Sequence, residues 1–263
     1  MTLQIDRLST TSSKLTLYCN GHVLGPATGF IWMIGKRLFL VSNWHVLAGR
    51  NTYTGQPLHS SAAVPDQLHF HFAEQEASQI KWLEGRLDLH DAREQATWLQ
   101  HPTLGQDIDI GAIEIPVPGV TKTFLALTEE DTKSDIAISV GSEVFIVGYP
   151  LGMAKQLQLP IWKRGSIASE FSVPFDGLPI FVVDTATREG MSGSPVYARS
   201  MGAYISSGGG LNISTGITSK FLGVYSGRYG STDELSAQLG RVWHSNMIQE
   251  VISGNTKASY KLR

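Results

Sequence analysis

The 263-residue sequence contains one cysteine, Cys19, and only 17% charged residues. A single thiol cannot form an intramolecular disulfide, so no disulfide framework holds this fold together. The formal net charge of −2 leaves no basic field of the kind that binds nucleic acid. No apolar run approaches the roughly 18 residues that a membrane-spanning helix requires. We therefore expect neither a nucleic-acid partner nor a membrane partner.

The amino terminus also lacks a feature, because residues 1–13 are polar and contain no apolar core of a secretory signal peptide. With the single cysteine, this favours a cytoplasmic location, although a processed mature form would have the same composition. Hydrophobic residues make up 42% of the sequence and there are 27 glycines. This composition is typical of a turn-rich β protein that is long enough to bury a core.

Short runs with strand-like apolar periodicity, separated by clusters of Gly, Pro and Asn, predict an antiparallel β architecture. Strand-like runs occur at 14–19, 29–34, 37–42, 67–72, 108–115, 143–148, 162–169, 180–183, 194–198 and 220–225. We expect an N-terminal lobe over residues 1–125 and a C-terminal lobe over 126–263, with the boundary near 117–140. The polar segment 73–96 is predicted to be irregular or partly helical, and the glycine-rich segment 206–210 to be a mobile loop. Apolar spacing over 238–252 predicts an amphipathic closing helix that ends at Gly254.

A serine between glycines is the most informative motif. Residues 189–196 read EGMSGSPV, with Ser192 between Gly190 and Gly193 and a strand-like segment after Pro195. Glycines beside a nucleophile let the backbone turn tightly, so that two amide N–H groups can converge on one point. We predict that Ser192 is the nucleophile of an acyl transfer and that the N–H groups of Gly190 and Ser192 form the oxyanion hole.

A serine nucleophile needs a base, and His45 is the best candidate among the eight histidines. It directly follows an apolar strand-like run and a short polar corner. Most of the others have simpler explanations as polar-face, turn or loop residues: His69, His71, His59, His90 and His101. We therefore predict that His45 accepts the proton of Ser192.

Asp109 is predicted to orient that base. It precedes the run 110–115, which is typical of a buried strand, and a desolvated carboxylate there needs a hydrogen-bond partner. An imidazole N–H would serve, and the carboxylate would fix its tautomer. Asp107 is the alternative, because it lies two residues earlier on the same strand face. The small residues Gly111 and Ala112 favour Asp109.

With the order His, Asp, Ser, the sequence resembles the trypsin-like serine peptidases of the PA clan, since subtilisins and α/β-hydrolases use other orders. The resemblance is closer to the bacterial branch with the high-temperature-requirement proteases and glutamyl endopeptidases. It covers about residues 15–228. The segments that carry it are 27–30 (ATGF), 42–46 (SNWHV), 109–113 (DIGAI), 141–152 (GSEVFIVGYPLG) and 184–195 (DTATREGMSGSP).

The resemblance implies an all-β fold of two antiparallel six-stranded β-barrels of chymotrypsin type with a C-terminal α-helix. It places the active site in the cleft between the lobes, and no PDZ domain is expected. It implies a serine endopeptidase that cleaves a polypeptide substrate through an acyl-enzyme, with neither an organic cofactor nor a metal.

The resemblance also implies a substrate pocket. Ala186 and Thr187 would line the primary pocket, and the segment with Tyr225, Ser226 and Gly227 would form the other wall, where an extended substrate adds as a β-strand. Ala186 supplies no charge, which disfavours a preference for Lys or Arg. Tyr225 stands where glutamyl endopeptidases have histidine, which disfavours an acidic preference. A small or polar pocket is expected.

One departure from the family bears on regulation. Digestive enzymes carry an aspartate before the nucleophilic serine, which pairs with a newly cut amino terminus, whereas this sequence has Met191. No activation by that ion pair is implied. The alternative function is a latent or catalytically silent binding or regulatory module that needs an activating protein partner to order the oxyanion loop. An esterase of another fold conflicts with the residue order, and Cys19 lies outside the motif, which excludes a cysteine protease.

Overall fold

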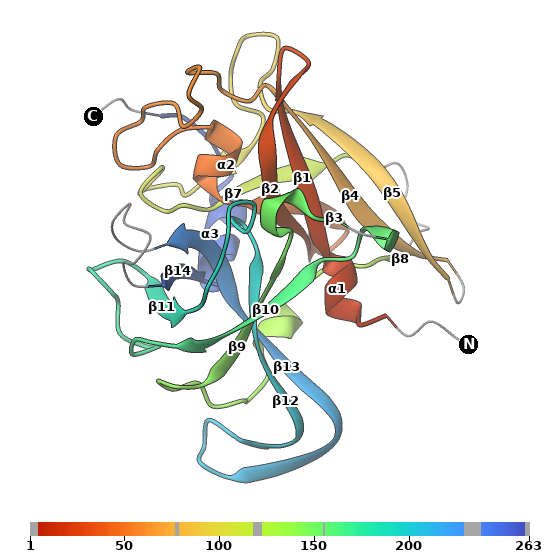
Figure 1. Cartoon of the computed structure of the whole chain (residues 1–263), viewed down its shortest axis with the longest axis vertical. Coiled ribbons are helices and arrows are strands. Elements are labelled where there is room, and N and C mark those ends of the chain that lie inside the picture. The colour runs from red at the N-terminus through yellow and green to blue at the C-terminus, as the bar shows by residue number, and fades with distance from the viewer. Residues whose placement is uncertain (1–4, 77–78, 118–122, 155, 229–237, 261–263) are drawn as a thin grey trace.

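The computed structural model describes residues 5–76, 79–117, 123–154, 156–228 and 238–260, which form two β lobes packed together (Figure 1). Among these residues the first sheet has nine antiparallel strands in the order β15-β6-β7-β3-β2-β1-β4-β5, with β8 paired to β4. Their bounds are β1 Ser12–Cys19, β2 His22–Ile34, β3 Arg37–Ser42, β4 Gln67–Glu76, β5 Gln79–Asp88, β6 Leu99–Gln100, β7 Gly111–Ile115, β8 Thr123–Phe124 and β15 Thr256–Lys257.

The second sheet closes into a ring in the order β10-β11-β14-β13-β12-β9. Its strands are β9 Glu143–Gly148, β10 Ile161–Ile167, β11 Ile180–Asp184, β12 Pro195–Ile205, β13 Leu211–Arg228 and β14 Leu239–His244. The helices described are α1 Arg7–Thr11, α2 Trp44–Ala48 and α3 Asn246–Gly254, with short 3₁₀ turns at η1 Glu129–Thr132, η2 Pro150–Gly152 and η3 Gln156–Gln158. The expected all-β fold of two antiparallel lobes with a C-terminal helix is confirmed. The second lobe is the closed six-stranded barrel, whereas the first sheet has more strands than six.

Local sequence accounts for several of these elements. Asn20 and Gly21 both have positive φ (50° and 79°), which is the backbone of the tight turn that favours Asn-Gly, and they join β1 to β2. The expected strands at 37–42 and 143–148 have the same bounds in the structure. The buried faces of the first lobe come from alternate apolar side chains, for example Leu38 and Leu40 on β3.

The expectation for residues 73–96 was wrong. Most of that segment is a hairpin, because β4 continues to Glu76 and β5 (Gln79–Asp88) pairs with it along its full length. The strand β5 lies at the end of the sheet order, and several of its side chains, such as Lys81 and Arg86, are exposed to solvent. A polar composition is therefore compatible with an edge strand, and the charges protect an exposed edge.

The closing helix is shorter than expected over residues 238–252. The first part of that segment is strand β14, in which Val242 pairs with Phe181 of β11 on one side and with Tyr225 of β13 on the other. The short apolar run fits both a strand and a helix, and closure of the barrel selects the strand. Helix α3 occupies the remainder and ends at Gly254, as predicted, with Asn255 in a left-handed conformation after it.

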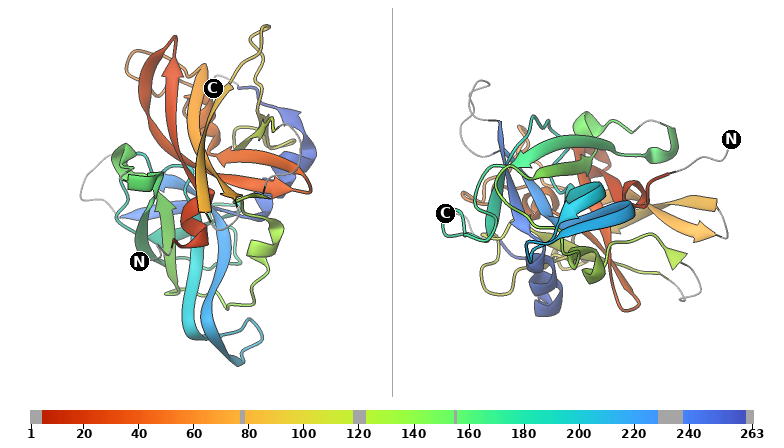
Figure 2. Two further views of the ribbon diagram at one scale, coloured as in Figure 1. Left: turned by 90° about the vertical axis from the view of Figure 1, so that its right-hand side faces the viewer. Right: turned by 90° about the horizontal axis from the view of Figure 1, so that it is seen from below.

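The glycine-rich segment 206–210 forms the tip of a long arm. Strands β12 and β13 extend beyond the barrel as a two-stranded hairpin, which projects from the body in Figure 1 and in the left view of Figure 2. Tyr204 of this arm donates a hydrogen bond to Asp135 (2.7 Å), which ties one face of the hairpin to the second lobe.

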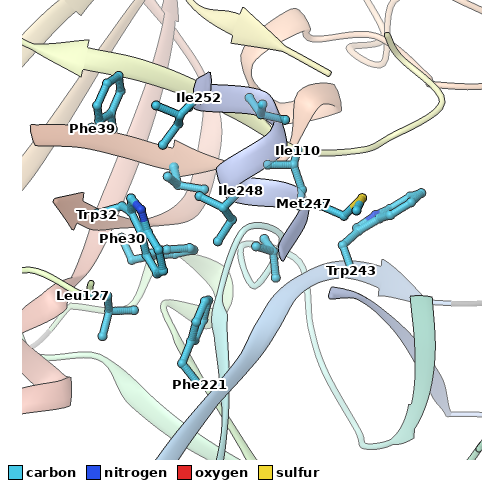
Figure 3. Close-up of a cluster of buried hydrophobic side chains, with 14 of the residues drawn as sticks. Phe30, Trp32, Phe39, Ile110, Leu127, Phe221, Trp243, Met247, Ile248 and Ile252 are labelled. Atoms are coloured by element: carbon cyan, nitrogen blue, oxygen red, sulfur yellow. The ribbon is translucent and has the colours of Figure 1, made fainter. Parts of the chain in front are cut away.

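One of the clusters of buried apolar side chains is shared by the two lobes. Figure 3 shows Phe30 and Trp32 from the first sheet, Phe221 from β13, and Met247 and Ile248 from α3 meeting in a single cluster of buried side chains. Segments near both ends of the chain also connect the two lobes. Trp162 of the second lobe donates to Ser9 of α1 (2.9 Å), and β15 pairs with β6 of the first sheet. This shared core holds the segments of the two lobes in fixed relative positions.

Candidate active site

His45 lies in the first turn of α2, at the lobe interface. Trp44 and Leu47 are buried, and Trp44 Nε1 donates to Gln100 Oε1 (3.0 Å). These contacts anchor the helix and leave the His45 side chain 22% exposed. The backbone N–H of His45 donates to Asp109 Oδ1 (2.8 Å), and His45 Nδ1 lies 2.7 Å from Asp109 Oδ2. One carboxylate thus holds both the backbone and the ring of the histidine.

Asp109 precedes β7 and is 4% exposed. Its carboxylate accepts a third hydrogen bond, from Ser226 Oγ to Oδ2 (2.5 Å). Its backbone carbonyl accepts from Asn43 Nδ2 (2.8 Å), which comes from the residue before α2. A buried carboxylate requires such partners. The two lobes cooperate here, because His45 and Asp109 belong to the first lobe and Ser226 to β13 of the second.

Ser192 lies in the turn that precedes β12. Gly190 and Gly193 flank it with φ of 88° and 86°, a region that only glycine adopts without strain. A Cβ on Gly193 would lie 2.1 Å from Thr28 O, so the turn is also packed too closely for a side chain. The turn is tied to the first sheet, because Thr28 N–H donates to Ser192 O (3.0 Å) and Thr28 Oγ1 donates to Gly190 O (2.7 Å).

The backbone N–H groups of this turn are suited to binding an anion. Leu151 N–H donates to Glu189 O (2.7 Å), which fixes the peptide unit before Gly190. Within the part of the chain that the structure describes, the N–H groups of Gly190 and Ser192 have no hydrogen-bond partner, whereas Gly193 N–H donates to Tyr225 O (2.8 Å). Two unpaired N–H groups beside a serine hydroxyl can stabilise a developing oxyanion.

His45 and Ser192 line one pocket of about 270 Å³. Glu189 and Gly190 contribute its wall on the side of the serine turn, and the β1–β2 hairpin and the loop after α2 contribute the rest. No β13 residue lines this pocket, yet a Cβ on Gly227 would lie 3.9 Å from Ser192 Oγ, so β13 passes beside the hydroxyl.

Tyr225 occupies the space beside the serine turn in the second lobe. Its side chain is 1% exposed, and its hydroxyl is hydrogen-bonded to Thr187 Oγ1. Burial raises the pKa of Tyr225, with the Thr187 hydrogen bond opposing the shift, so the phenol stays protonated. Arg228 Nη2 donates to Thr187 O (3.1 Å). Ala186 is exposed and lines a separate depression with Gly165 and Asp184.

The alternatives from the sequence lie elsewhere. The carboxylate that contacts His45 is that of Asp109, while Asp107 lines a different pocket with Pro102 and Thr103. His101 pairs with Glu250 (3.1 Å). In the described ranges no three His, Cys, Asp or Glu side chains gather as metal ligands. No helix among the described residues is long and apolar enough to cross a membrane.

The sequence did not indicate the hydrogen bonds that two residues, Thr28 and Ser226, make within the site. Thr28 was noted only as part of a motif, yet its Oγ1 also accepts from Tyr149 N–H (3.0 Å) and so joins the serine turn to the end of β9. Ser226 stays a predicted substrate-binding residue, and its hydroxyl in addition donates a hydrogen bond to Asp109. Both roles depend on residues more than 100 positions away, and no local pattern marks them.

Comparison with known proteins identifies the family and the fold of the chain. Residues 27–205 match the family described as the trypsin-like peptidase domain. No match was found among curated proteins. Among solved structures, the chain resembles the thermostable serine protease AL20 from an extremophilic microorganism, with 13% identity, TM-score 0.51, and 94% of this chain and 97% of that chain covered.

Two more solved structures show the same fold. The protease Anisep from Arthrobacter nicotinovorans has 16% identity and a TM-score of 0.50, with 92% of this chain and 93% of that chain covered. The serine endoprotease from Yersinia pestis has 12% identity and a TM-score of 0.51, with 94% of this chain but 63% of that chain covered. Since the family match spans most of the sequence, the chain belongs to the family of trypsin-like peptidase domains and has their chymotrypsin-like fold.

Proposed function

We propose that the protein is a serine endopeptidase that cleaves a polypeptide through a His45–Asp109–Ser192 triad. The observation that carries the proposal is the pair of hydrogen bonds that the backbone N–H and ring Nδ1 of His45 donate to Asp109 (2.8 and 2.7 Å), at a pocket that Ser192 also lines. A carboxylate on Nδ1 leaves Nε2 as the free acceptor, which is the tautomer that a general base needs.

The chemistry follows from these positions. Ser192 Oγ attacks the peptide carbonyl while His45 Nε2 takes its proton, and Asp109 stabilises the imidazolium that forms. The N–H groups of Gly190 and Ser192 stabilise the oxyanion, each such donor being worth roughly 3 kcal/mol. His45 then protonates the leaving amine, and water releases the acyl group by the same steps in reverse.

An ordered oxyanion turn favours the active form over the latent alternative. The carbonyls of Glu189, Gly190 and Ser192 each accept a hydrogen bond, from Leu151, Thr28 Oγ1 and Thr28 N–H respectively. Met191 stands where digestive enzymes have an ion-pairing aspartate. It is fully buried in the core of the second barrel, and this burial anchors the turn. All of these contacts come from within the chain, which supports the active form.

A fluorophosphonate probe tests the proposal, because it labels only activated serines. We expect one adduct by intact mass, on Ser192, that is absent from Ser192→Ala. The matched control is Ser194→Ala, two residues along the same turn. Absence of labelling on folded wild type would contradict the proposal and favour the binding module, and labelling of another residue would contradict the site.

A further inference from the structure

The two sides of Ser192 differ in how much room they offer a substrate. On the side of β13, the Tyr225 ring lies against β14, because a Cβ on Gly240 would be 2.3 Å from it. The Tyr225 hydroxyl is hydrogen-bonded to Thr187 Oγ1, and Arg228 Nη2 donates a hydrogen bond to the Thr187 carbonyl. Among the described residues, the space between Thr187 and β14, where a deep side-chain pocket would lie, is therefore occupied by the Tyr225 side chain.

The other side is open and apolar. The pocket that His45 and Ser192 share extends away from β13 and is lined by apolar side chains from three segments of the first lobe: Leu17, Leu24, Pro26, Val46, Leu58 and Pro65. Its volume of about 270 Å³ lies just below the roughly 300–1,000 Å³ of sites for drug-sized ligands, which suits one or two side chains. Its titratable lining residues are one carboxylate, Glu189, and two imidazoles, His45 and His59.

The backbone geometry determines which part of a substrate meets each side. On the side of β12 and the serine turn, the ladder pairing of β13 ends at Val224, which lies opposite Pro195, so Ser226 and Gly227 have no ladder partner on β12. An extended peptide can add to this free stretch, directly beside Ser192 Oγ. The acyl portion of the substrate then lies along β13. The portion after the scissile bond leaves in the opposite direction, into the apolar pocket.

We infer that this peptidase selects its cleavage sites mainly by the residues after the scissile bond. The pocket would take an aliphatic or aromatic side chain from the first or second of these residues and disfavour an acidic one, which would face apolar walls and the Glu189 carboxylate. This inference rests on the proposed function and adds its substrate class: peptides with an apolar residue at the first or second position after the cleaved bond.

The test uses peptides with one fixed acyl portion, chosen from a wild-type cleavage profile, and with Leu, Ala, Lys or Asp at the two following positions. We expect kcat/KM for the Leu peptides to exceed that for the Asp peptides at least about tenfold, since a hydrophobic pocket discriminates by roughly 10–200-fold. Varying the residue before the bond among uncharged side chains should have a smaller effect.

Pocket variants show whether the preference arises here. Leu24→Ser and Leu58→Ser should each reduce the Leu-over-Asp preference, and Leu58 lies in a loop and is 52% exposed, so its replacement leaves the core intact. Val23→Ser is the matched control, because Val23 precedes Leu24 in the same strand, is 60% exposed and does not line the pocket.

The outcomes separate the two proposals. Cleavage with equal kcat/KM for the Leu and Asp peptides, or an unchanged preference in both pocket variants, would overturn the inference while the peptidase function stands. Absence of cleavage together with absence of fluorophosphonate labelling would overturn the proposed function and this inference with it.

Discussion

Ser226 Oγ donates a hydrogen bond to Asp109 Oδ2 (2.5 Å), the same oxygen that lies 2.7 Å from His45 Nδ1. A residue of the second lobe therefore positions the carboxylate that holds the histidine of the first. Because the hydroxyl donates to a charged group, this bond is of the stronger kind. It makes the geometry of His45 dependent on the packing of the two lobes.

Replacing Ser226 tests that relationship. Ser226→Ala should lower kcat about tenfold with little change in KM, because loss of a hydrogen bond to a charged group costs about 1.5–3 kcal/mol and water can restore part of it. Steady-state kinetics on one peptide would measure both constants, with Ser200→Ala on the exposed arm as the control. A raised KM with unchanged kcat would instead assign Ser226 to substrate binding.

Asp109 is expected to be essential for turnover. Asp109→Asn should lower kcat by roughly 10³–10⁴-fold, because the amide favours the wrong histidine tautomer. Asp107→Asn, which changes the rival carboxylate two residues earlier, should retain most of the activity. Circular dichroism would verify that both variants fold. Equal losses in the two variants would show that Asp109 has no special role.

Gly190 should tolerate no side chain. Gly190→Ala places a Cβ 2.5 Å from Tyr149 O at a φ of 88°, and the peptide that presents the oxyanion N–H must shift. We expect kcat to fall by roughly 10²–10³-fold, the effect of losing one such donor. Gly209→Ala has a similar φ of 84° with nothing within 4 Å, so it measures backbone strain without the close contact. Comparable kcat values for these variants would contradict the oxyanion assignment.

Met191 is predicted to matter for stability. It is 0% exposed in the core of the second barrel, so Met191→Ala should reduce the free energy of unfolding by about 2–5 kcal/mol. Urea denaturation would measure the change. Met201→Ala, at a position 76% exposed on the arm, is the control and should have almost no effect. A small loss for Met191→Ala would mean that the turn is not anchored through this side chain.

Stability should fall in mild acid through His244. Burial lowers the pKa of His244 below its usual 6.5, with an opposing hydrogen bond to the Phe171 backbone, and the ring packs against Phe171 and Phe181. The unfolded chain thus binds this proton at higher pH than the folded chain does. The stability contribution is complete above about pH 6.5 and declines as the pH falls below it, until the folded-state pKa is passed.

The variant His244→Gln should flatten that decline. Thermal unfolding midpoints of wild type and variant, measured from pH 7.5 down to pH 5, give the two slopes. Some slope should remain in the variant, because desolvation also lowers the pKa of His69. Parallel curves would show that His244 does not contribute to the acid sensitivity.

The sequence alone determined the elements whose signals are local. The order of His45, Asp109 and Ser192, the glycines around the serine, and the strand bounds at 37–42 and 143–148 all follow from short patterns. Gly190 and Gly193 could be recognised because a tight turn requires residues without a Cβ. The lobe boundary and the cytoplasmic location stay predictions from the same patterns.

Only the tertiary structure decided the features that depend on long-range pairing. Polar β5 is a strand because β4 supplies its hydrogen bonds, and β14 is a strand because β11 and β13 lie on both sides of it. Ser226 reached Asp109, and the Tyr225 ring filled the space near Thr187, through contacts between distant segments. Such contacts form only when the lobes pack, so the secondary-structure propensity of a short segment cannot predict them.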